Sequence, residues 1–225
     1  INSDERQWSW KDEGLNSFVE YLCEELWDNK FPTRGGPAWT ITDYMKLPKD
    51  QLEPIMSNSE NIVGFGPNAY TKTATGLNIL RETIMGREQF DYAFKEYARR
   101  WAFKHPEPAD LFRTMEDASG EDLDWFWRGW FYGTEACDMA IDTVKYFTAD
   151  ISKDPPETKE STTMRGLPKP AGSTFDDISK IRNREDKNIQ FESDKDSTLQ
   201  DFYYRYNRGM EKYDTTKYAV TSPGG

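Results

Sequence analysis

The chain has 225 residues, which is enough for one large domain or two small ones. It is acidic, with 40 Asp and Glu against 29 Lys and Arg, and this balance disfavours nucleic acid as a partner, because nucleic-acid binding needs clustered positive charge. No run approaches the roughly 18 apolar residues of a membrane-spanning helix, so the sequence predicts no membrane span.

Apolar residues that recur every three or four positions predict a helical assembly over residues 1 to about 135. Pro and Gly residues over 38–66 indicate short elements and turns. Ser119 precedes an aromatic run and is expected to be the N-cap of the last helix in this part. The expected helices span residues 13 to about 30, 68–86, 87–104, 110–118 and a final segment that reaches Phe131.

The composition changes in the second part of the chain. Residues 143–147 alternate like a short strand, and residues 151 to about 197 are rich in charged residues, Ser, Thr and Pro, as is typical of a solvated connector. Residues 199–213 carry aromatic side chains at helical spacing, which predicts a last amphipathic helix. We therefore divide the chain into a helical part, residues 1–150, and a charged linker with a short amphipathic helix, residues 151–225.

The segment from Trp8 to Phe18 combines two Trp, an acidic pair and a Gly at the start of an apolar helical run. The second residue of the acidic pair is Glu13. Taken alone, Glu13 fits an ordinary acidic residue in the first turn of a helix, where the helix dipole favours negative charge. A single carboxylate is also a weak and unselective metal ligand, so this residue by itself predicts no metal site.

A second motif runs from Asn68 to Leu77 and contains Tyr70. A phenol stays protonated near neutral pH and can donate a hydrogen bond to a developing oxyanion. The alternative is that Tyr70 packs with Ala74 and Leu77 on one face of a helix. The sequence leaves both interpretations open.

Together the two motifs resemble those of the gluzincin zinc aminopeptidases, the aminopeptidase N type of metallopeptidase. In that family an H-E-x-x-H helix supplies two zinc ligands and the general base, and a Glu further along the chain supplies the third ligand. The resemblance places this ligand at Glu13. It also places the tyrosine of the family's Y-x-K-G-A segment, whose hydroxyl points at the tetrahedral intermediate, at Tyr70. Asp12 and Thr73 stand where the family usually has Asn and Gly.

The resemblance implies that the H-E-x-x-H motif lies before Ile1, so we expect the chain to be a piece of an enzyme. The sequence contains no H-E-x-x-H, no C-x-x-C and a single His, His105, which we expect to cap or pack at the end of the preceding helix. The implied cofactor is zinc, with its remaining ligands outside this chain. The implied partners are a peptide substrate and the missing N-terminal half of the catalytic domain.

The resemblance covers about residues 1–135 and implies a mainly α fold. This fold would be the helical second half of a thermolysin-like metallopeptidase catalytic domain, followed by an extended charged segment. The implied function is zinc-dependent hydrolysis of peptide bonds by an aminopeptidase, and we expect the chain alone to be inactive. The start of the chain has no signal-like segment, so localisation stays open, and a secreted or periplasmic parent enzyme is compatible with the sequence.

The alternative is a non-catalytic helical module that binds a peptide or a glycan. Its binding platforms would be Trp8, Trp10, Trp39 and Trp130, since aromatic rings provide large contact surfaces. Exposed, coplanar Trp rings on one surface would favour this module. Buried Trp rings would favour a catalytic scaffold.

Overall fold

The computed structural model describes residues 1–29, 31, 33–135, 177–196 and 199. Within these residues every regular element is helical, which confirms the predicted mainly α fold. None of the described helices is long and apolar enough to cross a membrane. The predicted strand over 143–147 lies outside the described residues, as does the predicted helix over 199–213 apart from its first residue.

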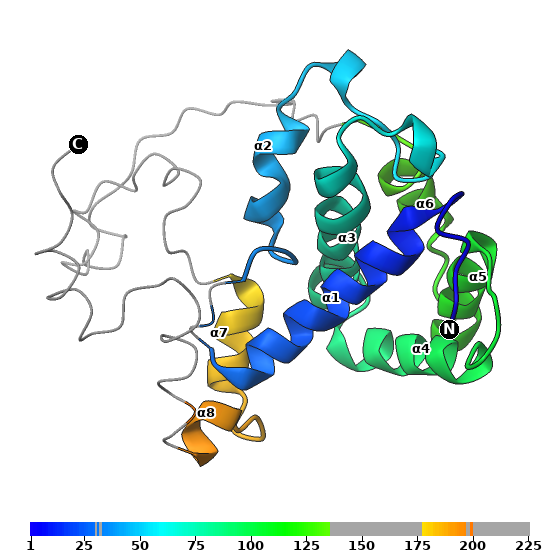
Figure 1. The fold of residues 1–225 in the computed structure, drawn as a ribbon. Coiled ribbons are helices and arrows are strands. Elements are labelled where there is room, and N and C mark those ends of the chain that lie inside the picture. The colour runs from blue at the N-terminus through cyan, green and yellow to red at the C-terminus, as the bar shows by residue number, and fades with distance from the viewer. Residues whose placement is uncertain (30, 32, 136–176, 197–198, 200–225) are drawn as a thin grey trace, which may run out of the picture.

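Helix α1, Ser9–Trp27, runs through the centre of the fold, as Figure 1 shows. It begins earlier than predicted and ends at Asp28, where the backbone becomes extended. Leu26 is 51% exposed and does not belong to the buried side of this helix. The side that faces the other helices is instead formed by residues at helical spacing: Trp10, Gly14, Phe18, Tyr21 and Glu25.

The helix predicted over 68–86 is a rod made of three consecutive pieces. It starts with a wide π-helical segment, η4, Gly66–Lys72, continues as α3, Thr73–Ile79, and ends with a second π-helical segment, η5, Leu80–Ile84. The rod ends before Gly86, whose φ of 85° favours glycine. Helix α1 packs against both η4 and α3.

Three further helices complete the first part of the fold: α4, Arg87–Arg100, α5, Pro108–Ser119, and α6, Asp124–Trp130. The prediction that Ser119 caps the last helix was wrong. Ser119 is the last residue of α5, where its hydroxyl donates to the carbonyl of Met115, and Gly120 ends this helix in the left-handed conformation. The N-cap of α6 is Leu123, which has no capping side chain.

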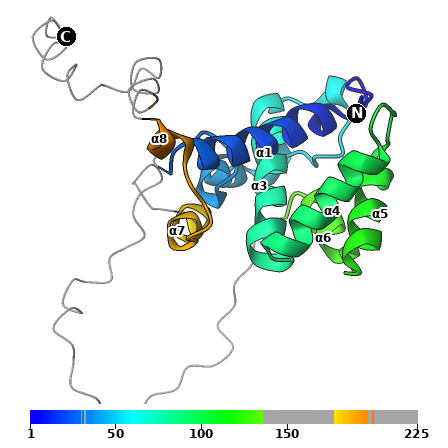
Figure 2. The same ribbon diagram turned by 90° about the horizontal axis from the view of Figure 1, so that it is seen from below.

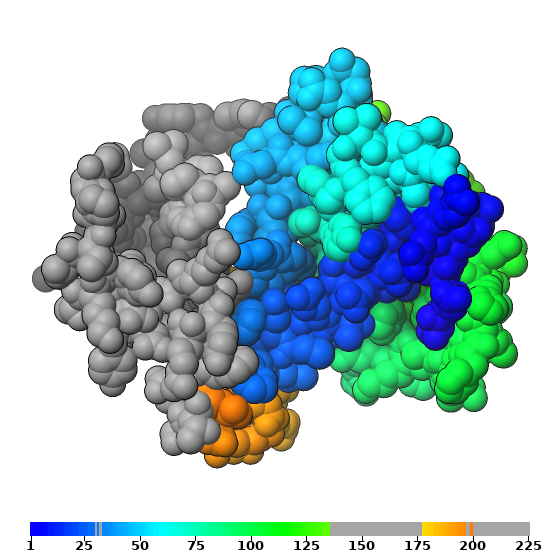
Figure 3. Space-filling model, viewed as in Figure 1, coloured from blue at the N-terminus to red at the C-terminus, as the bar shows by residue number. Residues whose placement is uncertain are grey.

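Between α1 and η4 the chain forms the short elements that the Pro and Gly residues predicted. They lie along one side of α1, as the space-filling view in Figure 3 shows. The elements are η1, Ala38–Ile41, α2, Thr42–Met45, η2, Lys49–Gln51, and η3, Ser59–Asn61.

An aromatic core joins α1 to α5 and α6. The Trp10 ring stacks on Phe112 with centroids 6.0 Å apart, and Phe112 stacks on Trp127 at 4.5 Å. The edge of Phe131 meets Trp10 at 4.9 Å. Such pairs add to the free energy gained from burying apolar area, so they fix the N-terminal half of α1 on the scaffold.

Two short helices, α7, Ile178–Glu185, and α8, Glu192–Lys195, lie beside the C-terminal half of α1, at the opposite end from α5 and α6 (Figure 2). Residues 178–185 fall inside the segment that the sequence analysis assigned to a connector. Helix α7 is held by polar contacts, because Arg182 donates to the carboxylate and the carbonyl of Glu82, and Asn183 donates to Glu25 at 3.0 Å.

Candidate active site

The two sequence motifs meet where α1 crosses η4. Gly14 makes this crossing close, because a Cβ atom there would lie 2.4 Å from the Thr73 Cβ and 2.7 Å from the carbonyl oxygen of Ala69. The missing side chain of Gly14 makes room for Thr73. The backbones that carry Glu13 and Tyr70 are therefore in direct contact.

The structure brings Glu13 and Tyr70 together although 57 positions separate them in the sequence. The Tyr70 hydroxyl faces the Glu13 carboxylate, and the interaction between these two groups is the largest of the effects that raise the pKa of Tyr70 above its ordinary value of 10.0. A small desolvation and the negative charges of Glu13 and Asp12 act in the same direction. Tyr70 is therefore neutral at pH 7 and able to donate.

Tyr70 is separated from the buried face of its helix. Its side chain is 37% exposed, whereas Ala74 and Leu77 are completely buried. The ring of Tyr70 meets the half-exposed ring of Phe65 edge-on at a centroid distance of 6.1 Å. Tyr70 thus does not pack with Ala74 and Leu77, which was the alternative interpretation of this residue.

Asn68 fixes the start of the π-helical segment. Its side-chain amide is buried and donates to the carbonyls of Glu53 and Pro54, at 2.8 and 3.2 Å. Lys72 lies at the other end of the segment and is also buried. Sequence analysis gave neither residue a role, although both lie within the quoted motif. Wide helical turns of this type are rare and occur often at functional sites.

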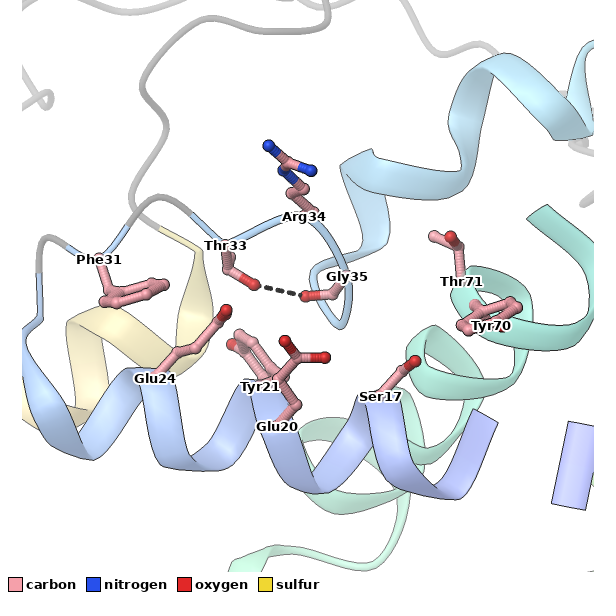
Figure 4. A pocket seen from close by; sticks show the side chains of 10 residues that line it. All are labelled: Ser17, Glu20, Tyr21, Glu24, Phe31, Thr33, Arg34, Gly35, Tyr70 and Thr71. Carbon is pink, nitrogen blue, oxygen red and sulfur yellow. Dashed lines mark hydrogen bonds between the residues drawn. The ribbon is translucent and has the colours of Figure 1, made fainter. Parts of the chain in front are cut away.

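A groove of about 360 Å³ begins at Tyr70 and Thr71 and follows α1. Figure 4 shows Ser17, Glu20 and Glu24 along the α1 side of the groove, and Tyr70 and Thr71 at one end. The segment with Thr33 and Gly35 forms the opposite side. The groove is open to solvent and has room for part of an extended peptide.

The described residues do not form a complete zinc site. They contain no group of three His, Cys, Asp or Glu side chains that could hold a metal ion, whereas catalytic zinc needs three protein ligands. His105 is exposed in the turn between α4 and α5, so it does not pack in the core, and the expectation that it caps the preceding helix stays a prediction. Glu13 is half-buried, and its carboxylate suits a metal but provides a single ligand.

The Trp residues favour the scaffold over the aromatic binding module. Trp10 is 1% exposed, and Trp8 and Trp130 are partly buried against the core. Trp39 is 41% exposed. The four residues therefore do not form one exposed aromatic surface.

A family model for the peptidase family M1 domain matches residues 6–130 of the chain. The match covers more than half of the sequence and includes both Glu13 and Tyr70. The chain belongs to peptidase family M1, a family of metallopeptidases that are in general zinc-dependent. No curated protein and no solved structure matched the chain.

Proposed function

We propose that the chain contributes to the active site of a zinc-dependent aminopeptidase, with Glu13 as one zinc ligand and Tyr70 as a catalytic residue. The observation that carries the proposal is the contact between these two side chains. Catalytic groups must reach one reacting centre, and two motifs far apart in the sequence converge here on one solvent-facing point.

The role of Tyr70 follows from its protonation state. A tyrosine hydroxyl is protonated at neutral pH, and a protonated phenol can donate a hydrogen bond to the oxyanion that forms when a peptide carbonyl is attacked. Before substrate binds, the same hydroxyl faces Glu13. The substrate oxyanion would take over this donor, which lies at the mouth of the groove.

The zinc site would be completed by polypeptide that carries H-E-x-x-H, a motif that the 225 residues do not contain. That segment would supply two histidine ligands and the base that activates water. Glu13 would be the ligand from this chain. The chain alone is therefore expected to lack tightly bound zinc and aminopeptidase activity.

The groove along α1 is the proposed path of the peptide. Aminopeptidases remove residues from the amino terminus, so the substrate would continue from the reacting centre in one direction only. The groove extends from Tyr70 past Ser17 and Glu20, along the exposed side of α1. An extended peptide spans about 3.3 Å per residue, so several residues could lie in the groove.

The experiment uses the zinc-loaded enzyme that contains these residues and compares Tyr70→Phe with Glu13→Gln. Tyr70→Phe should keep zinc and substrate binding and lower kcat by roughly 100- to 1,000-fold, the cost of removing one oxyanion donor. Glu13→Gln should lower zinc content and activity together, because it removes the charged ligand. Tyr92→Phe is the matched control, since Tyr92 is 61% exposed on α4.

Two results would contradict the proposal. A Tyr70→Phe enzyme that hydrolyses peptides at the wild-type rate would show that this hydroxyl is not used. A Glu13→Gln enzyme that keeps zinc as tightly as the wild type would remove Glu13 from the ligand set. Zinc content is measured after dialysis, so the second result is independent of activity.

A further inference from the structure

Lys72 is a buried lysine, two residues after Tyr70, whose position the proposed reaction does not explain. Lys72 is 2% exposed, and desolvation lowers its pKa to about 8. Burying an ammonium group is costly, so a buried lysine needs compensating contacts. The location of these contacts indicates what Lys72 does.

The contacts of Lys72 all lead to the end of α6. The ammonium Nζ donates to the carbonyl of Gly133 at 3.1 Å, and the carbonyl of Lys72 accepts from the indole Nε1 of Trp130 at 2.9 Å. The same indole lies against Gly76, where a Cβ atom would be 2.3 Å from the Trp130 Nε1. The end of η4 is thus held to the end of α6 by two hydrogen bonds, one from the Lys72 side chain and one to the Lys72 carbonyl. The packing of the Trp130 indole against Gly76 brings the two helices close together.

These contacts complete a clamp on the turn that carries Tyr70. On one side, α1 packs against Ala69 and Thr73 through Gly14, next to Glu13. On the other side, Lys72 joins the turn to Gly133. Tyr70 lies between the two attachments and has no bulky core contact of its own, since its side chain is exposed.

We infer that Lys72 is a positioning residue, whose buried ammonium holds the π-helical turn against the end of α6 and thereby sets the Tyr70 hydroxyl beside Glu13. The inference rests on the proposed role of Tyr70 for its functional part. The structural claim, that Lys72 fixes the π-helical turn, does not depend on the proposed role of Tyr70. The two parts are therefore tested separately.

The chain offers a closely matched control in Lys11. This lysine is 3% exposed, desolvation lowers its pKa to about 8, and its ammonium donates to the backbone carbonyl of Pro106. It lies on α1 and joins that helix to the turn before α5, away from the Lys72–Gly133 contact. Lys11→Met and Lys72→Met remove the same kind of buried contact at two different places.

The first measurement is amide hydrogen exchange of the 225-residue chain, followed by mass spectrometry. Lys72→Met should speed exchange over residues 66–76 by about tenfold, because a charge-assisted hydrogen bond is lost. Lys11→Met should speed exchange over residues 9–15 and affect residues 66–76 less than Lys72→Met does, because its effect there passes through the Gly14 contact. If Lys11→Met loosens residues 66–76 as much as Lys72→Met, or if Lys72→Met leaves 66–76 unchanged, the inference is wrong.

The second measurement is a double-mutant cycle in the zinc-loaded enzyme. Lys72→Met should lower kcat by about 10- to 100-fold with little change in KM, the scale expected from misplacing a catalytic group. In a Tyr70→Phe background, the same substitution should have little further effect, because Lys72 acts through Tyr70. Equal losses in both backgrounds would overturn the inference and leave the proposed role of Tyr70 intact.

Trp130→Phe provides a second variant in case Lys72→Met does not fold. It keeps an aromatic ring but removes the indole donor to the Lys72 carbonyl. It should loosen residues 66–76 and lower kcat in the same direction as Lys72→Met, by a smaller factor. A Trp130→Phe enzyme with unchanged exchange and unchanged kcat would contradict the clamp.

Discussion

The two ends of α1 are held in different ways. The N-terminal half packs through aromatic rings and the close approach at Gly14, with Trp10 in the core. The C-terminal half meets α7 through buried polar groups: Glu25 on α1 is 2% exposed and accepts from Asn183, and the neighbouring Glu82 on η5 is 3% exposed and pairs with Arg182. The end that carries Glu13 is therefore fixed by shape, and the far end is fixed by ionic and hydrogen-bonded contacts.

This difference predicts how each end responds to a change. Packing contacts are insensitive to pH and salt but intolerant of added volume. Buried charges tolerate volume better but depend on the presence of every partner, because a buried charge without its partner is costly. The comparison can be tested with substitutions at each end.

The largest expected effect is at Glu82. Burial acts against its charge, but hydrogen bonds from Arg87 and Arg182 and the charges of Arg87 and Arg81 hold the pKa of Glu82 below its ordinary value. Glu82→Gln would leave three guanidinium groups without this charge, so we expect a loss of about 3–5 kcal/mol in the free energy of unfolding.

Urea denaturation measures this loss, and hydrogen exchange over 178–185 reports whether α7 detaches. The matched control is Glu96→Gln, since Glu96 binds two arginines, Arg99 and Arg100, and its side chain is 14% exposed against 1% for Glu82. It should have a much smaller effect. Equal losses for the two variants would show that burial does not distinguish the two sites.

The second largest effect is expected at Gly14. A methyl group there would meet the Thr73 Cβ at 2.4 Å and the Ala69 carbonyl at 2.7 Å, so the helices must move apart. We expect Gly14→Ala to cost about 2 kcal/mol of unfolding free energy, after the gain in helix propensity is subtracted.

Thr73→Gly should restore part of the stability lost in Gly14→Ala, because it removes the nearest contact. The carbonyl of Ala69 would remain too close, so the rescue is expected to be incomplete. Chemical denaturation of the single and double variants measures the coupling. Purely additive effects would argue against the direct contact between these two positions.

The third prediction concerns pH at the α7 end. Burial, and then the charge of Asp177, raise the pKa of Glu25 from 4.5 to about 8, against the opposing charges of Lys180 and Arg87. The folded state therefore holds a proton that the unfolded state releases between these values. The contribution of Glu25 to stability is full below pH 4.5 and is lost as pH rises through about 8.

Glu25→Gln should remove this dependence, because the amide mimics the protonated acid. The difference between wild type and variant, measured by denaturation from pH 5 to 9, should change by on the order of 1 kcal/mol as the pH rises through this range. The comparison with the variant is needed because Lys11 and Lys72, with pKa values lowered to about 8, add stability as pH rises from 8 to 10.5. This contribution is the same in both proteins and cancels in the difference. A constant difference would contradict the protonated state of Glu25.

The smallest effect is expected for the exposed ion pair between Arg6 and Glu60. Their atoms are 3.0 Å apart, but the side chains are 87% and 66% exposed. Arg6→Ala should change the free energy of unfolding by less than about 1 kcal/mol, and salt should abolish the difference. A larger loss in denaturation would mean that this pair is coupled to the buried parts of the fold.

The sequence was sufficient to predict the helices of the first part, because their apolar side chains recur with helical spacing. Phe90 and Tyr97 on α4, which follow this spacing, are buried. It was also sufficient to single out Glu13 and Tyr70, through their motifs. Their contact could not be derived from spacing, since it depends on how α1 crosses η4.

The docking of α7 was not predictable from periodicity. Residues 178–185 contain few apolar side chains, and their charged composition is typical of a connector. What holds α7 is the match between Arg182 and the buried Glu82, and no local pattern reveals a partner about a hundred positions away. The role of Gly120 was missed for a related reason, because Ser119 fits both the end of one helix and the start of another.

The π-helical segment η4 has a consequence for how this chain should be compared with other sequences. Each residue added to or removed from a helix turns every following side chain by about 100° around the axis. A π turn accommodates one residue more than an α turn, and it directs Tyr70 to solvent and Lys72 to the interior. In a relative that lacks this extra residue, a different side chain would occupy the position of Tyr70. A sequence alignment without a gap would then pair residues that point to opposite sides of the helix.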